Sequence, residues 1–331
     1  MSVTVIDASL VKKLWGKQVW GEAQEALFWK SFITREEPEK MDKDTGAGVI
    51  VRKDDLKKEK GDTITLQLVS KLTGSGKTGD NTLEGFEEEM NFWPFSVTVD
   101  QVRHAVRIKG RMEEQKAAFD MRAAAKMALK TWLVEKIDKG IFAALCSSPS
   151  ANRVLFGGVA TEIGQIAASS KLTAALIGKA KRKAMLATPK FRPLVIKGKP
   201  YYLMVVHPYA MRDLRTDSSI LNALHDAWWR GSDNPIFTGA EIVYDGVVIY
   251  EHPWVKKTTE GAASANALYN LFLGGHAGVW GVASEPNWEE DDFDYKNSHG
   301  FSIGQIQGVA KAVFNDEDHA TLAVITGGAD D

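Results

Sequence analysis

Two runs of alternating apolar residues, separated by a glycine-rich connection, mark the segment from residue 61 to residue 110. The first run, DTITLQLVS, has its apolar positions two residues apart: Ile64, Leu66 and Leu68. The second run, FSVTVDQVRHAVRI, does the same and then changes parity, so we expect a bulge near Asp100. The pattern predicts an extended β-hairpin arm. A two-stranded ribbon is marginally stable alone in water, so a neighbouring protein subunit is the simplest surface for it to lie on.

Helical spacing of apolar residues is strongest over Met112–Leu145. One stripe carries Ala117, Met121, Ala124, Ala125, Ala128, Trp132, Leu133, Ile137 and Ile141. A helix of about 30 residues would be roughly 45 Å long, which is typical of a spine that crosses a whole domain. A second amphipathic helix is expected over Lys171–Leu186, with a basic face that we interpret as solvated: Lys179, Lys181, Arg182 and Lys183.

The N-terminal segment Asp7–Ile33 also has helical spacing, although its two glycines weaken it. Trp15, Trp20 and Trp29 are too many large apolar groups for a free helix of this length. They pack either on the core of this chain or on a neighbouring subunit, and the sequence leaves both options open.

The second half of the chain has mainly strand signals. YYLMVVHP ends at a proline, and Asp245-Gly246 lies between two β-rich runs as in a tight hairpin. Residues 266–282 are apolar and rich in small side chains, so we expect them to be buried, whereas SEPNWEEDDFDY reads as an exposed acidic loop. FSIGQIQGVAKAVF and ATLAVIT are expected to be terminal strands. Long helices combined with mostly antiparallel strands indicate an α+β fold.

Composition narrows the function classes. The chain has 331 residues and a formal net charge of −2, which lacks the basic excess of a dedicated nucleic-acid binder. Cys146 is the single cysteine, so an intrachain disulfide is excluded. We find neither a signal peptide nor a stretch approaching the roughly 20 apolar residues of a membrane span. These features indicate a protein made in a reducing compartment, with no membrane partner expected.

The stretch KLTGSGKTGD raises the possibility of a nucleotide site, because Gly76-Lys77-Thr78 matches the end of a phosphate-binding loop. The motif requires a glycine five positions before Gly76, and that position is Lys71. The residues that follow are glycines and carboxylates, which would repel a phosphate instead of starting a helix beneath it. We therefore interpret the stretch as the tip of the hairpin arm.

Other candidate chemistry is weak. The seven histidines are scattered, and none has the spacing of a zinc site. Glu289–Asp294 contains enough carboxylates for a hard cation but lacks the glycine and spacing of an EF-hand, so a solvated acidic loop is favoured. We expect no enzyme, no cofactor and no metal.

The order of elements and several phrases resemble the tailed-bacteriophage major capsid proteins, in particular a podophage-type family. The phrases are KGDTITLQLVSKLTGSG, VRHAVRIKGRMEEQKAAFDMRAAAKMALKTWLVEKIDKGIFAAL, HPYAMRDLR, NPIFTGAEIVYDGVVIYEHPWV, LFLGGHAGVWGVA and HGFSIGQIQGVAKAVFNDEDHATLAVIT. They cover most of the chain from Gly61 onward, in order, and none is a catalytic motif.

The resemblance implies the tailed-phage major capsid fold, with five parts in chain order. These are an N-terminal arm (1–60), an extended β-hairpin arm or E-loop (61–110), a peripheral domain with the spine helix (111–170), an axial domain (171–285), and C-terminal strands returning to the peripheral domain (286–331). It also implies a structural subunit that is made in the bacterial host cytoplasm and self-assembles into pentamers and hexamers of an icosahedral virion shell. Such a shell encloses double-stranded DNA without sequence preference, and scaffold, portal and decoration proteins are further possible partners.

Several residues are expected at contacts between subunits because they combine exposed apolar or charged groups with protruding segments. They are Trp15, Trp20, Lys71, Lys77, Glu87, Glu88 and Glu89. Three alternatives stay open: an encapsulin-like compartment of the same fold that encloses cargo protein, a monomeric binding module with a protruding hairpin, and a nucleotide-dependent enzyme using Gly76-Lys77-Thr78. Shell size and covalent cross-linking between subunits are not determined by the sequence.

Overall fold

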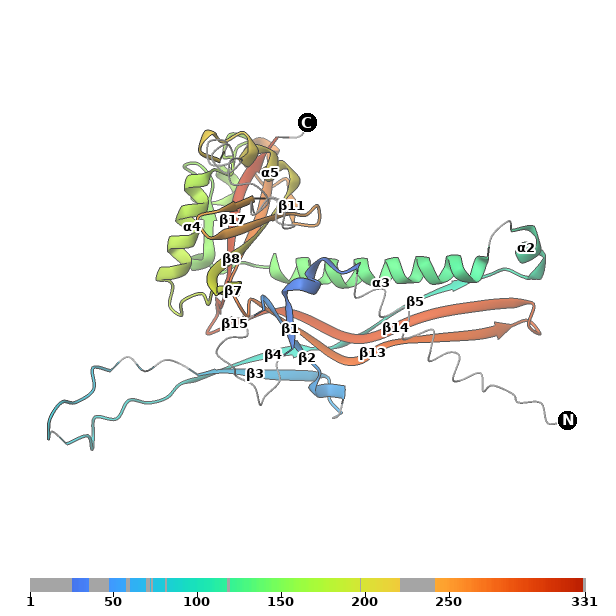
Figure 1. Ribbon diagram of the computed structural model, residues 1–331, viewed down its shortest axis with the longest axis horizontal. Coiled ribbons are helices and arrows are strands. Elements are labelled where there is room, and N and C mark those ends of the chain that lie inside the picture. Colours follow the sequence, from blue (N-terminus) through green and yellow to red (C-terminus); the bar gives the residue numbers. More distant parts are fainter. Residues whose placement is uncertain are drawn as a thin grey trace.

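A computed structural model describes residues 26–35, 48–57, 60–69, 72, 74–80, 82–117, 120–196, 198–220 and 242–329. The chain has an elongated part, in which one long helix lies along long strands, and a more compact part that carries α4 and α5 (Figure 1). A two-stranded arm projects away from both (Figure 1). Each part is organised around its own sheet. One buried apolar core joins α4 and α5 to the eight-stranded sheet, and the other joins the long helix to the five-stranded sheet and also takes in Leu203, Val205 and Leu271 of the eight-stranded sheet.

The elongated part contains a five-stranded sheet in the order β1-β2-β13-β14-β5. Its centre is a long antiparallel hairpin of β13 (Gly278–Phe293) and β14 (Ser298–Lys311). β5 (Asp100–Arg107) extends β14, and β2 (Ile50–Lys53) pairs in parallel with β13, followed by β1 (Ile33–Arg35).

The helix α3 (Met121–Leu145) packs on one face of this sheet (Figure 1). Its buried side chains recur at helical spacing, and Ala125, Leu133, Ile137 and Ile141 of the predicted stripe are among them. Ala124 and Ala128 of that stripe are exposed instead, and Leu129 is buried. The buried side chains meet Trp280, Val282 and Ile303 of the sheet in one core.

The predicted single helix over Met112–Leu145 is wrong in one respect, because the structure has two helices. α2 (Arg111–Lys116) ends before α3 begins. The side chain of Asp120 accepts hydrogen bonds from the backbone N–H groups of Arg122 (2.9 Å) and Ala123 (3.2 Å). This N-cap satisfies free donors of a new helix start, so α3 is shorter than the predicted spine.

The compact part contains an eight-stranded sheet with the path β6-β17-β12-β8-β10-β9. Its strands are β6 (Val154–Phe156), β17 (Thr321–Gly328), β12 (Asn266–Leu273), β8 (Lys199–Val206), β10 (Val247–Glu251) and β9 (Ile242–Tyr244), with β7 (Leu194–Ile196) on β8 and β11 (Lys257–Thr258) on β12. Every residue of β12 and of β17 is buried. α4 (Ala174–Leu186) and α5 (Pro208–Arg215) pack on this sheet.

Several sequence predictions for this region are confirmed. Residues 266–273 form a fully buried strand, and 321–328 form the last strand. Asp245 and Gly246 have φ values of 46° and 73° and connect β9 to β10. Both central residues of the turn are in the left-handed region, as a type I′ hairpin turn requires. Short 3-10 helices complete the fold: η1 (Phe28–Phe32), η2 (Asp55–Lys57), η3 (Ala151–Arg153), η4 (Ile163–Gln165) and η7 (Ala262–Ser264).

The arm is an antiparallel pair of β3 (Thr63–Val69) and β4 (Phe92–Thr98), in register from Thr63 opposite Thr98 to Val69 opposite Phe92. The predicted bulge near Asp100 is instead a break in the strand. Val99 donates its N–H to the carbonyl of Asp62 (2.8 Å), and the chain then leaves β3 and pairs with β14 as β5. The change of parity in the sequence therefore marks a change of partner sheet.

Two other expectations are corrected. The acidic segment expected as a loop is mostly strand, because β13 continues to Phe293 opposite β14 and the turn is only 294–297. The helix expected to reach Ile33 does not, since Phe28–Phe32 form η1 and Ile33 begins β1. The rest of that expected helix lies outside the described residues.

Candidate assembly surfaces

The apolar face of the arm is buried at its base and half-buried farther out. At the base, Ile64 and Val97 face each other and are both buried. In the middle, the ring of Phe95 lies 5.8 Å from that of Phe314 in the short hairpin β15 (Val313–Phe314) and β16 (Glu317–Asp318). At the distal end, Leu68 and Trp93 of this face are half-buried, whereas Val69 and Phe92 lie on the opposite face and are each about half exposed. The distal arm therefore presents apolar surface of the kind that marks protein contacts.

The tip of the arm bends where its glycines have positive φ, at Gly76 (65°) and Gly79 (69°). The ammonium of Lys77 lies 3.5 Å from the centre of the Phe86 ring, and the carboxylate of Glu88 accepts the N–H of Gly74 (2.6 Å). Within the described part of the tip, the residues after Thr78 form a turn and extended chain, without the helix start that a phosphate loop uses. The Lys77 ammonium therefore contacts an aromatic ring on the other side of the tip.

The structure places the predicted contact residues in two groups. Lys77, Glu87, Glu88 and Glu89 lie together at the exposed tip of the arm. Trp15, Trp20 and Lys71 fall outside the described residues. Trp29, which the sequence left between its own core and a neighbour, is fully buried in the core of this chain.

The start of the described chain is tied to the spine helix by a residue that the sequence reading missed. The side chain of Asp138 in α3 accepts the backbone N–H of Phe28 (3.1 Å). Burial raises the pKa of Asp138 to about 6, against the lowering effect of the N–H groups of Phe28 and Trp29. The available signal was a carboxylate next to Ile137 on the buried stripe, which is rare without a partner.

His252 completes this anchor. Its ring stacks on Phe142 at 4.5 Å and lies 4.6 Å from the ring of Phe28. Burial lowers the pKa of His252 to about 4, so the ring is neutral at pH 7. The N-terminal segment, α3 and the strand β10 therefore meet in one aromatic cluster.

The acidic half of β13 is bonded to side chains of the same part of the chain. Glu290 receives two hydrogen bonds from the Arg122 guanidinium (2.7 and 2.6 Å), and Asp292 lies 2.6 Å from Nδ1 of His299. Among the described residues, no three His, Cys, Asp or Glu side chains gather as a metal ion would require. The geometry points to ion pairs that hold α3 against the sheet.

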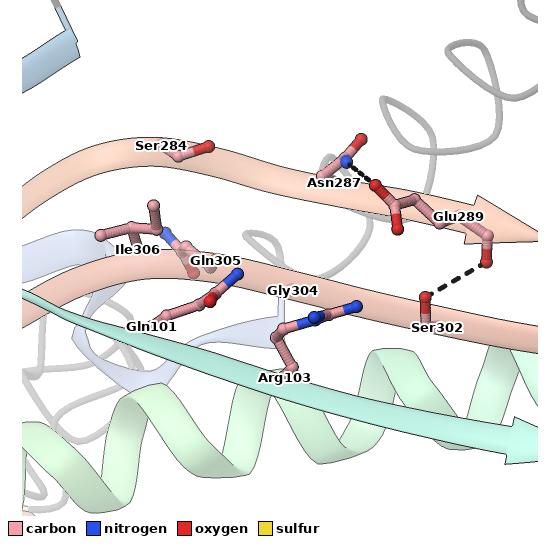
Figure 2. A pocket seen from close by; sticks show the side chains of 9 residues that line it. All are labelled: Gln101, Arg103, Ser284, Asn287, Glu289, Ser302, Gly304, Gln305 and Ile306. Atoms are coloured by element: carbon pink, nitrogen blue, oxygen red, sulfur yellow. Dashed lines mark hydrogen bonds between the residues drawn. The ribbon is translucent and has the colours of Figure 1, made fainter.

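A polar cavity of about 220 Å³ lies over β5, β13 and β14 (Figure 2). It is lined by Gln101, Arg103, Ser284, Asn287, Glu289, Ser302, Gly304, Gln305 and Ile306. Asn287 donates to Glu289 (2.8 Å), and Ser302 donates to the Glu289 carbonyl (3.4 Å) (Figure 2). β13 has two register shifts beside it, between Val282 and Asn287. Its lining has one guanidinium, that of Arg103, and one carboxylate, that of Glu289, and it lies beside the irregular part of β13.

A buried ion pair joins the end of the spine helix to the C-terminal strands. Lys311 at the end of β14 lies 2.8 Å from Asp318, and both side chains are almost inaccessible to solvent. Lys311 also donates to the carbonyl of Ser147 (2.6 Å), and Asp318 accepts the N–H of Ser150 (3.1 Å). These bonds hold the end of the elongated part of the chain next to β16.

Comparison with known proteins gives one consistent answer. The sequence profile of a family described as phage capsid protein matches residues 4–327. The chain is 29% identical over 364 residues to a major capsid protein of Pseudomonas phage KPP25, covering 95% of this chain and 94% of that protein.

Solved structures agree. The capsid of Ralstonia phage GP4 is similar at 28% identity with a TM-score of 0.77, covering 86% of this chain and 88% of that one. The capsid of the cyanophage Pam1 is similar at 26% identity with a TM-score of 0.79, covering 92% of each chain. The capsid of the Helicobacter pylori bacteriophage KHP30 shares the fold at 15% identity and a TM-score of 0.72, over 91% of each chain.

These matches confirm the predicted resemblance and the α+β capsid fold. Among the described residues, no helix is long and apolar enough to span a membrane. The family profile and the major capsid relative both extend over nearly the whole chain, from the N-terminal segment to the last strand. The chain belongs to this family of phage capsid proteins.

Proposed function

We propose that this capsid protein is a shell subunit that uses its arm to join neighbouring subunits into pentamers and hexamers, which close around double-stranded DNA. The observation that supports this most directly is the distal arm. Val69 and Phe92 at its distal end are about half exposed, and its backbone is a two-stranded ribbon. Such a ribbon gains stability when a second molecule covers it.

The two-sheet organisation supports a division into a peripheral and an axial domain. On this proposal, the five-stranded sheet with α3 belongs to the peripheral domain, and the eight-stranded sheet with α4 and α5 belongs to the axial domain. The arm is confined to β3 and β4, since β5 is a strand of the five-stranded sheet. The C-terminal strands serve both domains, since β14 pairs in the first sheet and β17 in the second.

The charged tip of the arm is where we place contacts with another subunit. Glu87 and Glu89 are exposed, and Glu88 is bonded within the tip to Gly74. We keep Trp15, Trp20 and Lys71 as proposed contact residues on the sequence argument alone. Closed rings of identical subunits need one surface to meet a different surface, so each tip requires a complementary site elsewhere on the chain.

The proposal is tested by purifying the protein and examining it by size-exclusion chromatography and negative-stain electron microscopy. We expect closed shells or rings of five and six subunits. A protein that stays monomeric at all concentrations would support the binding-module alternative and contradict the proposal. Measuring the DNA content of purified particles distinguishes a phage shell from an encapsulin-like compartment, which would carry cargo protein instead. The relatives named above, which are phage capsids, favour the first.

A further inference from the structure

The near-neutral net charge of the chain hides a strong local asymmetry. Residues 163–212 contain seven lysines and three arginines and no aspartate or glutamate. Because the whole chain carries −2, the remaining residues carry −12. The basic stretch runs through α4, β7 and β8, and within α4 the residues Lys179, Arg182 and Leu186 are three or four positions apart, so they share one side of that helix.

Part of this charge is neutralised within the chain and part is not. Lys181 bonds to Asp245 (2.8 Å), and Lys183 donates to the carbonyl of Val154 (2.9 Å). The other exposed cations of this face form no ion pair within the described residues: Lys179, Arg182, Lys190, Arg192 and Lys199. Burial lowers the pKa of Lys183, and the charges of Arg153 and Lys179 lower it further, as expected where positive charge accumulates.

Exposed apolar side chains lie among these cations. Met185 and Leu186 end α4 and are 48% and 81% exposed, and Val195 in β7 is 46% exposed. We call this surface the basic face and define it by Lys179, Arg182, Met185, Leu186, Lys190 and Val195. A face that only interacted with water would gain nothing from three large apolar groups, so the combination indicates a macromolecular partner.

The arm tip has the complementary composition. Leu83, Phe86 and Met90 are all at least half exposed. Between them lie Glu84, Glu87, Glu88 and Glu89, and of these Glu87 and Glu88 bond to backbone N–H groups of the tip. The tip and the basic face thus match both in charge and in having apolar groups between the charges.

We propose that the tip segment 82–90 of one subunit binds the basic face of a second copy of this chain. This inference rests on the proposed function, since it supplies the complementary site that a ring of subunits requires. A tip and a basic face of the same subunit do not meet: the arm extends away from α4 (Figure 1). Apolar contacts give the interface most of its affinity, and the opposite charges set partner choice and register.

Packaged DNA is the other polyanion that a basic face could bind. The structure favours the protein partner because a phosphate backbone would leave Met185, Leu186 and Val195 uncovered, whereas Leu83, Phe86 and Met90 would cover them.

Chemical cross-linking of assembled shells tests the contact directly. A zero-length carbodiimide reagent joins carboxylates to lysines that touch, and mass spectrometry locates the joined pairs. We expect Glu84, Glu87 or Glu89 joined to Lys179 or Lys190 of another subunit. Arm carboxylates joined only to lysines outside the basic face would overturn the proposal.

Charge reversal gives a second test that uses assembly as its readout. The variants Glu84→Lys/Glu87→Lys/Glu89→Lys and Lys179→Glu/Arg182→Glu/Lys190→Glu are each expected to lower shell yield at least about tenfold, since like charges that face each other cost more than the 1.4 kcal/mol of a tenfold change. Combining the two sets is expected to restore yield. A matched control, Lys60→Glu/Lys109→Glu/Lys136→Glu, changes net charge equally on exposed lysines elsewhere and is not expected to be rescued by the arm variant.

The outcomes separate this inference from the proposed function. A wild-type protein that forms no shells contradicts the proposed function. Wild-type shells combined with unimpaired assembly of both variants overturn the inference alone. If the basic-face variant assembles normally but retains less DNA, the face binds nucleic acid and the inference is also overturned.

Discussion

Asp138 in the spine helix accepts a hydrogen bond of 3.1 Å from the backbone N–H of Phe28, 110 residues earlier in the chain. This bond holds the first described segment against α3, with Trp29 buried and Phe28 packed on Phe142. The bond therefore fixes Phe28 at a defined point on the helix.

Replacing Asp138 with Ala should release that segment. The N–H of Phe28 would lose its acceptor, and an unpaired buried donor costs about 1–3 kcal/mol. We expect faster proteolysis and faster hydrogen exchange at residues 27–32. Asp138→Asn keeps an acceptor oxygen and is the control. Equal protection of residues 27–32 in wild type and Asp138→Ala would contradict the role of the bond.

The free energy of unfolding should fall as the pH drops from 6.5 toward 4. The pKa values of His252 and His319 are lowered from 6.5 to about 4 by burial, so the unfolded chain binds more protons in this window. Their contribution is present above pH 6.5 and is lost as the pH falls through 4. The raised pKa of Asp138 has the opposite effect. Between pH 3.8 and about 6 the folded chain binds more protons at this carboxyl than the unfolded chain, so its contribution to the free energy of unfolding grows as the pH falls.

His252→Phe isolates one histidine because it keeps a ring between Phe28 and Phe142. Urea unfolding of the unassembled subunit at pH 7.5 and pH 5 should show a smaller difference in this variant, by about 1–2 kcal/mol after allowance for solvent screening. An unchanged pH dependence would show that His252 is not a neutral buried group.

Lys311→Met should be one of the most destabilising single changes in the chain. It leaves Asp318, which is 1% exposed, without its cation. Removing one partner of a buried ion pair costs about 3–5 kcal/mol. Adding Asp318→Asn to Lys311→Met removes the uncompensated charge and should recover part of the loss. Thermal unfolding of the three proteins measures both effects, and a single variant as stable as wild type would refute the argument.

Two glycine-to-alanine changes should have opposite effects. A Cβ on Gly308 would overlap the backbone carbonyl of Thr98, where β14 passes the base of the arm, whereas a Cβ on Gly140 in α3 meets nothing within 4 Å. We expect Gly308→Ala to cost about 1–3 kcal/mol. Gly140→Ala should be neutral or stabilising by up to about 1 kcal/mol, the helix propensity difference. Urea midpoints of the two variants provide the comparison.

The Gly76-Lys77-Thr78 stretch should bind no nucleotide. The Lys77 ammonium lies against Phe86, and the tip lacks the helix start that would bind phosphates. Calorimetric titration with ATP and magnesium should give no saturable signal. Binding that disappears in Lys77→Ala would revive the enzyme alternative.

The contact residues show where sequence reasoning stops. The charged tip at Lys77 and Glu87–Glu89 could be predicted as an assembly element because charge and glycine content are visible locally, and its role stays a prediction. Asp138 and His252 were missed, since their roles come from partners 110 residues or more away in the chain. The sequence showed the basic cluster of the Lys171–Leu186 helix but favoured a solvated face for it, because helical spacing alone does not show what lies opposite a charged surface.

Local periodicity determined the elements that lie within one continuous segment. The arm strands, the buried stripe of α3 and the Asp245-Gly246 turn follow from residue spacing and turn chemistry, which act between near neighbours. Tertiary structure alone decided where the arm ends and the sheet begins. Val99 marks that boundary because the strand after it, β5, pairs with β14 instead of with β3. It also made the acidic segment a strand, because backbone pairing with β14 and the Arg122–Glu290 ion pair outweigh the loop preference of those residues.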